Sequence, residues 1–146
     1  MLGAKTDLVQ TIPNLITVDA VQGLQVDTAI GILEKNSQAG LLGKIVVIDL
    51  GNNGTFTSSE FDTIMQIVGP TRHAYFLTLK VPRDWETSNN DVIESGVRRY
   101  PNASLIDWRS ASINHPEYFW DDGIHLRPEG ATVYTNLILA AISAGH

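Results

Sequence analysis

Apolar residues recur along this chain with two periods, which alternate from one stretch to the next. Spacings of three and four residues are typical of a helix with one buried side, and short apolar runs are typical of buried strands. The first pattern predicts helices over residues 1–12, 23–39, 57–68, 90–100 and 128–141. The second predicts strands over residues 15–21, 45–50, 74–79 and 103–106.

Turn and capping residues indicate where several of these elements begin. Thr57 and Glu60 have the spacing of a capping box at the start of the third helix. Asn90 is the expected N-cap of the fourth helix, after a loop over residues 81–89. Pro128 suits the first turn of the last helix, and residues 107–118 have no regular pattern.

Alternating strands and helices predict one α/β domain over residues 1–146, with a parallel sheet between two layers of helices. The alternation begins with a helix that has no strand before it. Since the first strand of such a fold is often central, we expect the first strand to be missing from this chain. We further expect residues 15–21 to pair with residues 45–50, or a second copy of the chain to fill the gap, because unpaired strand edges are unfavourable.

Composition narrows the class of protein. The chain is 43% hydrophobic and 18% charged, as a globular domain is. A net charge of −6 argues against a nucleic-acid partner, and no apolar run approaches the ~20 residues of a membrane span. The sequence contains no cysteine and no clustered metal-ligand motif, so we expect neither a metal nor a cofactor.

Asp122 and His125 form the main candidate catalytic pair. They lie three residues apart in a turn before the last helix, where the carboxylate can orient the imidazole. An imidazole base oriented by an acid is what a hydroxyl nucleophile requires. The structural alternative is that Asp-Gly starts a turn and that the histidine caps a helix.

A second candidate group follows two other strands. Asn53, in the turn Gly-Asn-Asn-Gly after the strand at 45–50, can offer a side-chain N–H, and Gly23 can offer a backbone N–H. Both follow parallel strands, so they are expected on the same edge of the sheet as Asp122 and His125, where two donors could bind an oxyanion. Ordinary turn chemistry and a helix-entry glycine are the alternatives.

Other chemistry-bearing residues have plainer interpretations. Asp49 is expected to be a hydrogen-bonded structural carboxylate, and His115 a loop residue. The tryptophans are expected to pack in the core or at its rim, with a sugar-binding groove as the alternative; they are Trp85, Trp108 and Trp120.

Together these motifs resemble an SGNH (GDSL-type) hydrolase domain, and among such domains the extracytoplasmic domain of acyltransferase-3 proteins that O-acetylate peptidoglycan. Residues 50–54 resemble the block with the oxyanion asparagine, and residues 122–130 the D-x-x-H block. The resemblance implies a flavodoxin-like three-layer fold, catalytic Asp122 and His125, and an oxyanion hole from Asn53 and Gly23. It also implies an acyl donor, a carbohydrate acceptor in the cell wall and an extracytoplasmic location.

The sequence departs from this family in one respect. The family's nucleophile is the serine of a Gly-Asp-Ser block after the first strand, and no such block occurs here. Ser58 and Ser59 lie at a helix start without the surrounding sequence of a nucleophile turn. We therefore expect a truncated and inactive chain. Three functions stay open: a peptidoglycan O-acetyltransferase domain, a carbohydrate esterase or lipase-like hydrolase, and a non-catalytic remnant that binds glycan.

Overall fold

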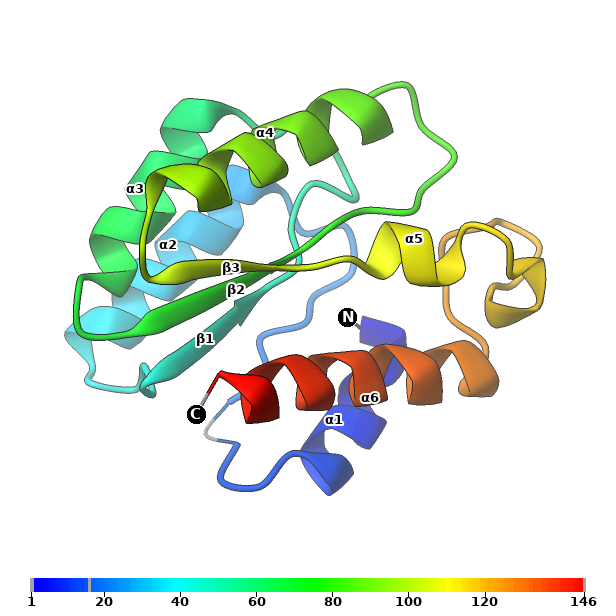
Figure 1. The fold of residues 1–146 in the computed structure, drawn as a ribbon, viewed down its shortest axis with the longest axis horizontal. Helices are drawn as coiled ribbons and strands as arrows, with labels where there is room; N and C mark the ends of the chain where they lie inside the picture. Colours follow the sequence, from blue (N-terminus) through cyan, green and yellow to red (C-terminus); the bar gives the residue numbers. More distant parts are fainter. Residues whose placement is uncertain (1, 16, 146) are drawn as a thin grey trace.

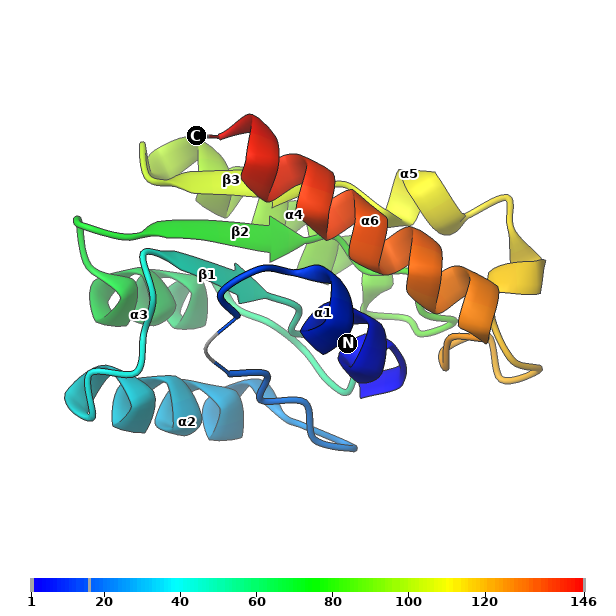
Figure 2. The same ribbon diagram turned by 90° about the horizontal axis from the view of Figure 1, so that it is seen from below.

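The computed structural model describes residues 2–15 and 17–145 and shows a three-layer α/β/α arrangement (Figures 1 and 2). Three parallel strands lie in the order β1-β2-β3. Helices α2, α3 and α4 cover one face of the sheet, and α1 and α6 cover the other (Figure 1). The predicted α/β class and the parallel sheet with helices on both faces are confirmed.

The element bounds follow the predicted order closely. The strands are β1 (Ile45–Ile48), β2 (His73–Leu77) and β3 (Ala103–Ile106). The helices are η1 (Leu2–Ala4), α1 (Lys5–Thr11), α2 (Val26–Gln38), α3 (Ser58–Val68), α4 (Glu86–Arg99), α5 (Trp108–Ser112), η2 (Pro116–Tyr118) and α6 (Pro128–Ala144). Thr57 and Glu60 form the predicted capping box, and Pro128 occupies the first turn of α6.

Apolar packing on both faces of the sheet holds the layers together. On one face, Phe61 of α3 stacks on Phe76 of β2, with ring centroids 4.2 Å apart. On the other face, the rings of Trp108 and Tyr134 pack in a T-shaped arrangement with centroids 5.2 Å apart. Because side chains on both faces of the sheet are buried, apolar residues follow one another along each strand.

The predicted strand at 15–21 is wrong for the residues described, and Ile16 lies outside them. Residues 17–21 have no strand structure and no backbone hydrogen bond to β1 within the described chain. A strand needs a neighbour at hydrogen-bonding distance, and none lies beside this segment. The expected pairing of 15–21 with 45–50 is therefore also wrong.

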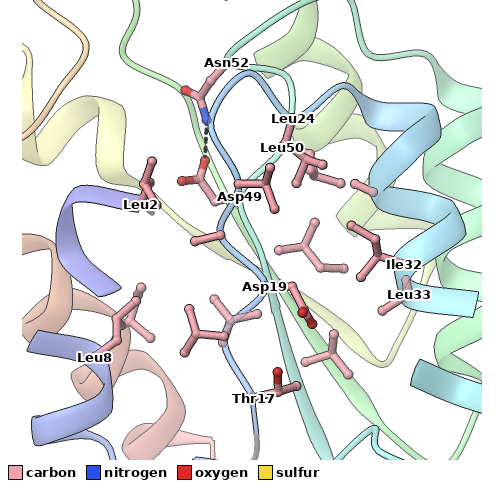
Figure 3. A pocket seen from close by; sticks show the side chains of 18 of the residues that line it. Leu2, Leu8, Thr17, Asp19, Leu24, Ile32, Leu33, Asp49, Leu50 and Asn52 are labelled. Carbon is pink, nitrogen blue, oxygen red and sulfur yellow. Dashed lines mark hydrogen bonds between the residues drawn. The ribbon is translucent and has the colours of Figure 1, made fainter. Parts of the chain in front are cut away.

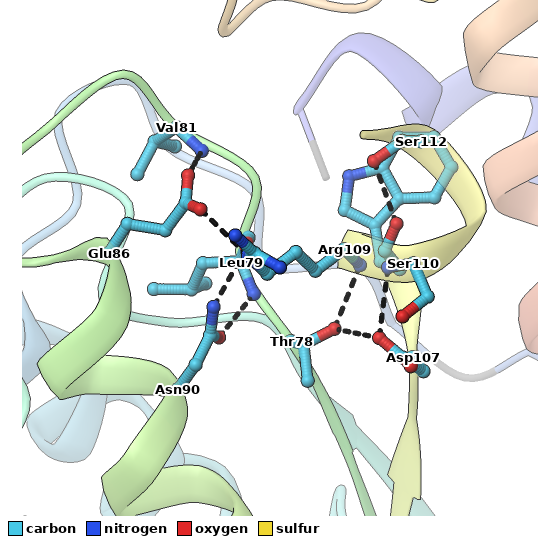
Figure 4. Close-up of polar contacts among 10 residues, drawn as sticks. Thr78, Leu79, Val81, Glu86, Asn90, Asp107, Arg109, Ser110 and Ser112 are labelled. Carbon is cyan, nitrogen blue, oxygen red and sulfur yellow. Dashed lines mark hydrogen bonds and ion pairs between the residues drawn. The ribbon is translucent and has the colours of Figure 1, made fainter. Parts of the chain in front are cut away.

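The predicted cap of the fourth helix is wrong as well. Helix α4 begins at Glu86, with Trp85 at its N-cap, and Asn90 lies inside the helix. Its buried side chain accepts a hydrogen bond from Leu79 N at 2.7 Å and donates one to Leu79 O at 3.0 Å (Figure 4). Asn90 thus satisfies the backbone beyond β2 instead of starting a helix.

Residues 107–118 are more regular than predicted, because side chains close local turns. Asp107 caps α5 by accepting from Ser110 N, and its Oδ1 also accepts from the Thr78 hydroxyl at 3.0 Å. Arg109 of α5 pairs with Glu86 of α4 at 2.8 Å (Figure 4). These contacts join the carboxyl ends of β2 and β3 to the helices that follow them.

No helix of the described chain is long and apolar enough to span a membrane.

Candidate active site

Asp122 and His125 meet in the turn before α6. His125 Nδ1 lies 2.6 Å from Asp122 Oδ2, and both side chains are about half exposed to solvent. Asp122 Oδ1 accepts hydrogen bonds from the backbone N–H groups of Ile124 and His125. The carboxylate is therefore held by the turn itself and in turn holds the ring, with Nδ1 as the donor and Nε2 as the basic nitrogen.

These hydrogen bonds lower the pKa of Asp122 from its ordinary value of 3.8 to about 2. The bond from the His125 ring is the largest cause, followed by the two backbone N–H groups, while slight desolvation opposes them. The group therefore remains a carboxylate throughout the pH range in which histidine titrates, as an orienting acid must.

The turn at residues 51–54, which carries Asn53, is held by Asn89 of α4. Asn89 Nδ2 donates to Gly51 O at 2.9 Å and to Gly54 O at 2.8 Å, and its Oδ1 accepts from Phe56 N at 2.8 Å. Asn89 is 1% exposed. Gly51 has φ +98°, and a Cβ there would lie 2.8 Å from Asn89 Nδ2, so the turn requires glycine at this position.

The loop that contains Gly23 lies against the same turn. Gln25 Nε2 donates to Asn53 O at 2.7 Å, and Asn53 Nδ2 lies 3.5 Å from Leu24 O. Gly23 has φ +68° and is exposed. The two predicted donors, Asn53 and Gly23, therefore lie on loops in direct contact with each other.

A cavity of about 860 Å³ is bordered by these loops and by His125. Gly23, Asn52, Asn53 and His125 all line it. It continues along β1, between Leu2 and Leu8 on one side and Ile32 and Leu33 on the other (Figure 3). Asn53 and His125 thus border one cavity.

Asp49, the last residue before this turn, is hydrogen bonded from two directions. The hydroxyl of Tyr134, in α6, donates to Oδ2 at 2.8 Å, and Asn52 Nδ2 donates to Oδ1 at 2.8 Å. Burial raises the pKa of Asp49, but the positive charge of the amino terminus and hydrogen bonds, these two among them, outweigh it, and the net shift is downward. Asp49 therefore links the asparagine turn to the helix that follows His125.

Hydroxyl side chains are scarce around the cavity. Among the described residues that line it, only Thr17 and Tyr134 carry one. The Tyr134 hydroxyl is bound to Asp49, and burial together with that carboxylate raises its pKa well above the ordinary value. Thr17 lies at the opposite end of the cavity from Asn52 (Figure 3). In the described chain no hydrogen bond joins either hydroxyl to the His125 ring, as a nucleophile would require.

The other candidate histidines in the described chain are bound to partners outside the Asp122–His125 turn. His115 binds Glu117 at 2.7 Å and stacks on Tyr118, and His73 contacts the Ser104 hydroxyl at 2.9 Å. Trp108 is buried in the core, whereas Trp120 is 53% exposed. Across residues 2–15 and 17–145, no three acidic or histidine side chains are grouped so that they could hold a metal ion.

Asn89 is the residue that the sequence analysis missed, since it was assigned to a loop. No short-range pattern identifies it, because its partners lie 33 to 38 residues earlier in the chain. An asparagine pair inside a helix is nevertheless a signal, since asparagine is a poor helix former and needs a compensating partner.

Comparison with known proteins gives relatives of one kind. No protein-family model matches the sequence. The chain is 34% identical over 144 residues to "Putative peptidoglycan O-acetyltransferase YrhL" of Bacillus subtilis (strain 168), a match that covers 99% of this chain and 22% of that protein. The chain thus spans less than a quarter of the length of this curated relative.

Solved structures share the fold. The C-terminal catalytic domain of Streptococcus pneumoniae peptidoglycan O-acetyltransferase A, solved with a methylsulfonyl adduct, superposes with a TM-score of 0.85 at 23% identity. That match covers 98% of this chain and 87% of the other, so part of the other chain has no counterpart here. A family 3 carbohydrate esterase from Talaromyces cellulolyticus matches with a TM-score of 0.66 at 17% identity, covering 91% of this chain and 76% of the other.

Proposed function

This chain is an SGNH-like domain, homologous to the catalytic domain of peptidoglycan O-acetyltransferases, and we propose that it carries the base and the oxyanion donors of a serine acyltransferase acting on a cell-wall carbohydrate. The observation that supports this most is the single cavity bordered by His125, Asn53 and Gly23, with Asp122 bound to the imidazole. The nucleophilic serine is not part of this sequence, which contains no Gly-Asp-Ser.

In the proposed reaction, a serine hydroxyl entering this cavity gives its proton to His125 Nε2 and attacks the carbonyl carbon of an acetyl ester. The imidazolium is stabilised by Asp122, whose carboxylate stays ionised. The donor alcohol then leaves with the proton, and an acetyl-serine remains. A carbohydrate hydroxyl, deprotonated by the same imidazole, takes the acetyl group and restores the serine.

Asn53 and Gly23 are proposed to hold the oxyanion of each tetrahedral intermediate. In this structure the Asn53 amide reaches only the Leu24 carbonyl, at 3.5 Å, which is a weak hydrogen bond. A side chain so loosely held can turn toward a developing negative charge. Loss of one such donor typically lowers kcat by a factor of about 10²–10³.

Turnover of p-nitrophenyl acetate tests the proposal. We expect the chain of 146 residues to show none above the buffer rate, because the attacking oxygen is absent. A version preceded by an apolar strand that ends in Gly-Asp-Ser is expected to turn over the ester, and His125→Ala in that version to abolish it. Turnover by the unextended chain that His125→Ala removes would contradict the assignment of a missing nucleophile.

A second candidate function is hydrolysis of acetylated carbohydrates, favoured by the shared fold of family 3 carbohydrate esterases. The two functions differ in the acceptor of the acetyl group. Mass spectrometry of a peptidoglycan oligosaccharide incubated with the extended protein and an acetyl donor separates them: transfer adds an acetyl group to the sugar, whereas hydrolysis releases only acetate. Glycan binding without either reaction would favour the non-catalytic alternative.

A further inference from the structure

A second pocket, of about 470 Å³, borders the turn that carries Asp122 and His125. Its volume lies within the range of small-molecule binding sites. We propose that this pocket binds a sugar ring of the acceptor carbohydrate, stacked on the indole of Trp120. The identity of this ligand as the acceptor rests on the proposed function, whereas the binding itself requires no acyl transfer.

The exposed indole of Trp120 is the first reason. Trp120 lines the pocket and is 53% exposed, whereas the neighbouring Phe119 is buried in the core. The guanidinium carbon of Arg127 lies over the indole, 4.9 Å from the ring centroid, and helps to hold it in place. An indole offers a wide apolar surface, and the C–H groups on one face of a sugar ring can pack against such a surface.

The backbone of the catalytic turn fixes the position of Trp120. Its N–H donates to His125 O at 2.8 Å, and its carbonyl accepts from Gly123 N at 2.8 Å. Phe119 and Leu126, the residues next to this pair, form an antiparallel bridge. Trp120 and His125 therefore belong to one hydrogen-bonded loop, so a sugar stacked on the indole is held in a defined position relative to the imidazole.

The charged groups around the pocket favour a neutral ligand with hydroxyl groups. Lys80 and Arg127 bring positive charge to its lining, and Glu117 and Asp121 bring negative charge, so the two signs are balanced. An ammonium group only donates hydrogen bonds and a carboxylate only accepts them, whereas a sugar hydroxyl does both. Lys80 and the fully exposed Asp121 can therefore bind hydroxyl groups of one sugar from both sides of the hydrogen-bonding requirement.

Lys80 connects this pocket with the cavity that His125 borders, because it lines both. The loop that follows it packs against the catalytic turn, since a Cβ on Gly123 would lie 3.6 Å from Pro82. The Lys80 ammonium lies 5.4 Å from the centroid of the Phe119 ring, beside Trp120 in the chain. A carbohydrate of several sugars can thus occupy both spaces, with one sugar on Trp120 and another at the imidazole.

An NMR titration of the chain of 146 residues tests this. The probe is a peptidoglycan tetrasaccharide without its peptides. Trp120→Ala removes the stacking surface, and Trp120→Phe retains a smaller aromatic ring. Val9→Ala is the control, because Val9 is exposed on α1 and borders neither the cavity nor the pocket. Circular dichroism checks that each variant is folded.

We expect the tetrasaccharide to shift the indole N–H signal of Trp120 and the amide signals of Lys80 and of residues 119–123. Trp120→Ala should weaken binding by about tenfold or more, as truncation of a central aromatic contact does. Trp120→Phe should recover part of the affinity, and Val9→Ala should bind like the parent chain. Absence of binding, equal affinity in Trp120→Ala, or shifts in the parent chain that fall on another surface would each overturn the proposal.

Kinetics of the extended protein that carries Gly-Asp-Ser separate this proposal from the proposed function. With the tetrasaccharide as acceptor, Trp120→Ala should raise KM more than it lowers kcat. Binding at Trp120 without acetyl transfer by the extended protein would support the sugar site and count against the acyltransferase assignment. Transfer with the same KM in the parent and in Trp120→Ala would support the acyltransferase and overturn the sugar site.

Discussion

Asn89→Ala is the substitution that most sharply tests how the asparagine turn is held. The change removes three hydrogen bonds, to Gly51 O, Gly54 O and Phe56 N. Two of them are buried and the third is partly buried, so water replaces them poorly. At roughly 1–1.5 kcal/mol for each bond lost, the free energy of unfolding should fall by about 3–5 kcal/mol. For a chain of this length, that corresponds to a fall in Tm of roughly 10 °C.

Urea unfolding followed by circular dichroism measures the effect, and NMR amide shifts of residues 51–54 show where it acts. Asn36→Ala is the matched control, because its side chain makes one exposed hydrogen bond, to Asp19. We expect that control to change stability by less than about 0.5 kcal/mol. If Asn89→Ala cost no more than Asn36→Ala, or if the shifts of 51–54 did not move, the assigned role of Asn89 would be incorrect.

Three other predictions concern the same region. His125→Ala removes the ring hydrogen bond, so the pKa of Asp122 should rise from about 2 toward 3.8. The lowered pKa stabilises the fold above pH 3.8, and this stability is lost as the pH falls toward 2. Carboxyl NMR shifts should therefore show that Asp122 is protonated at higher pH in the variant, and an unchanged midpoint would contradict the pairing. Gly51→Ala should lower the free energy of unfolding, measured in urea, by about 2 kcal/mol because Gly51 has a positive φ. Gly31→Ala, in open space on α2, should raise it by about 0.5–1 kcal/mol, and equal effects of the two substitutions would refute the steric argument. Tyr134→Phe should cost about 1–3 kcal/mol by removing a donor from a partly buried carboxylate, and a neutral result in the same assay would count against that contact.

The parts of the fold that could be predicted from the sequence are those determined by local patterns. Apolar runs identified β1, β2 and β3, and the capping box of Thr57 and Glu60 located the start of α3. These signals are contained in a few neighbouring residues, so they do not depend on what lies elsewhere in the chain.

The errors arose where a distant partner decides the structure. Residues 17–21 have a strand-like sequence but no neighbouring strand to pair with. Asn89 and Asn90 resemble loop and capping residues, yet both lie inside α4 because they satisfy backbone groups of two other loops. Their helix propensity is outweighed by buried hydrogen bonds whose partners cannot be identified from spacing.

The candidate site also combines features set by local sequence with features that depend on distant residues. The Asp122 and His125 pair could be predicted because a three-residue turn joins them. Asn53 and His125 were expected on the same edge of the sheet because the strands before them were predicted to be parallel. The two residues border one cavity in the structure, whose strands are parallel. Asp49 and Tyr134 lie 85 residues apart, so the hydrogen bond by which they link the asparagine turn to α6 could not be predicted from the sequence.

Covalent labelling of an introduced serine tests the account most directly. The extended protein, with a strand ending in Gly-Asp-Ser before Leu2, is treated with methanesulfonyl fluoride and its intact mass is measured. The account predicts one methylsulfonyl group on that serine, formed rapidly with His125 and Asp122 present and lost in His125→Ala. Labelling that is absent, or that proceeds equally fast without His125, would show that this imidazole does not act on a hydroxyl in the cavity.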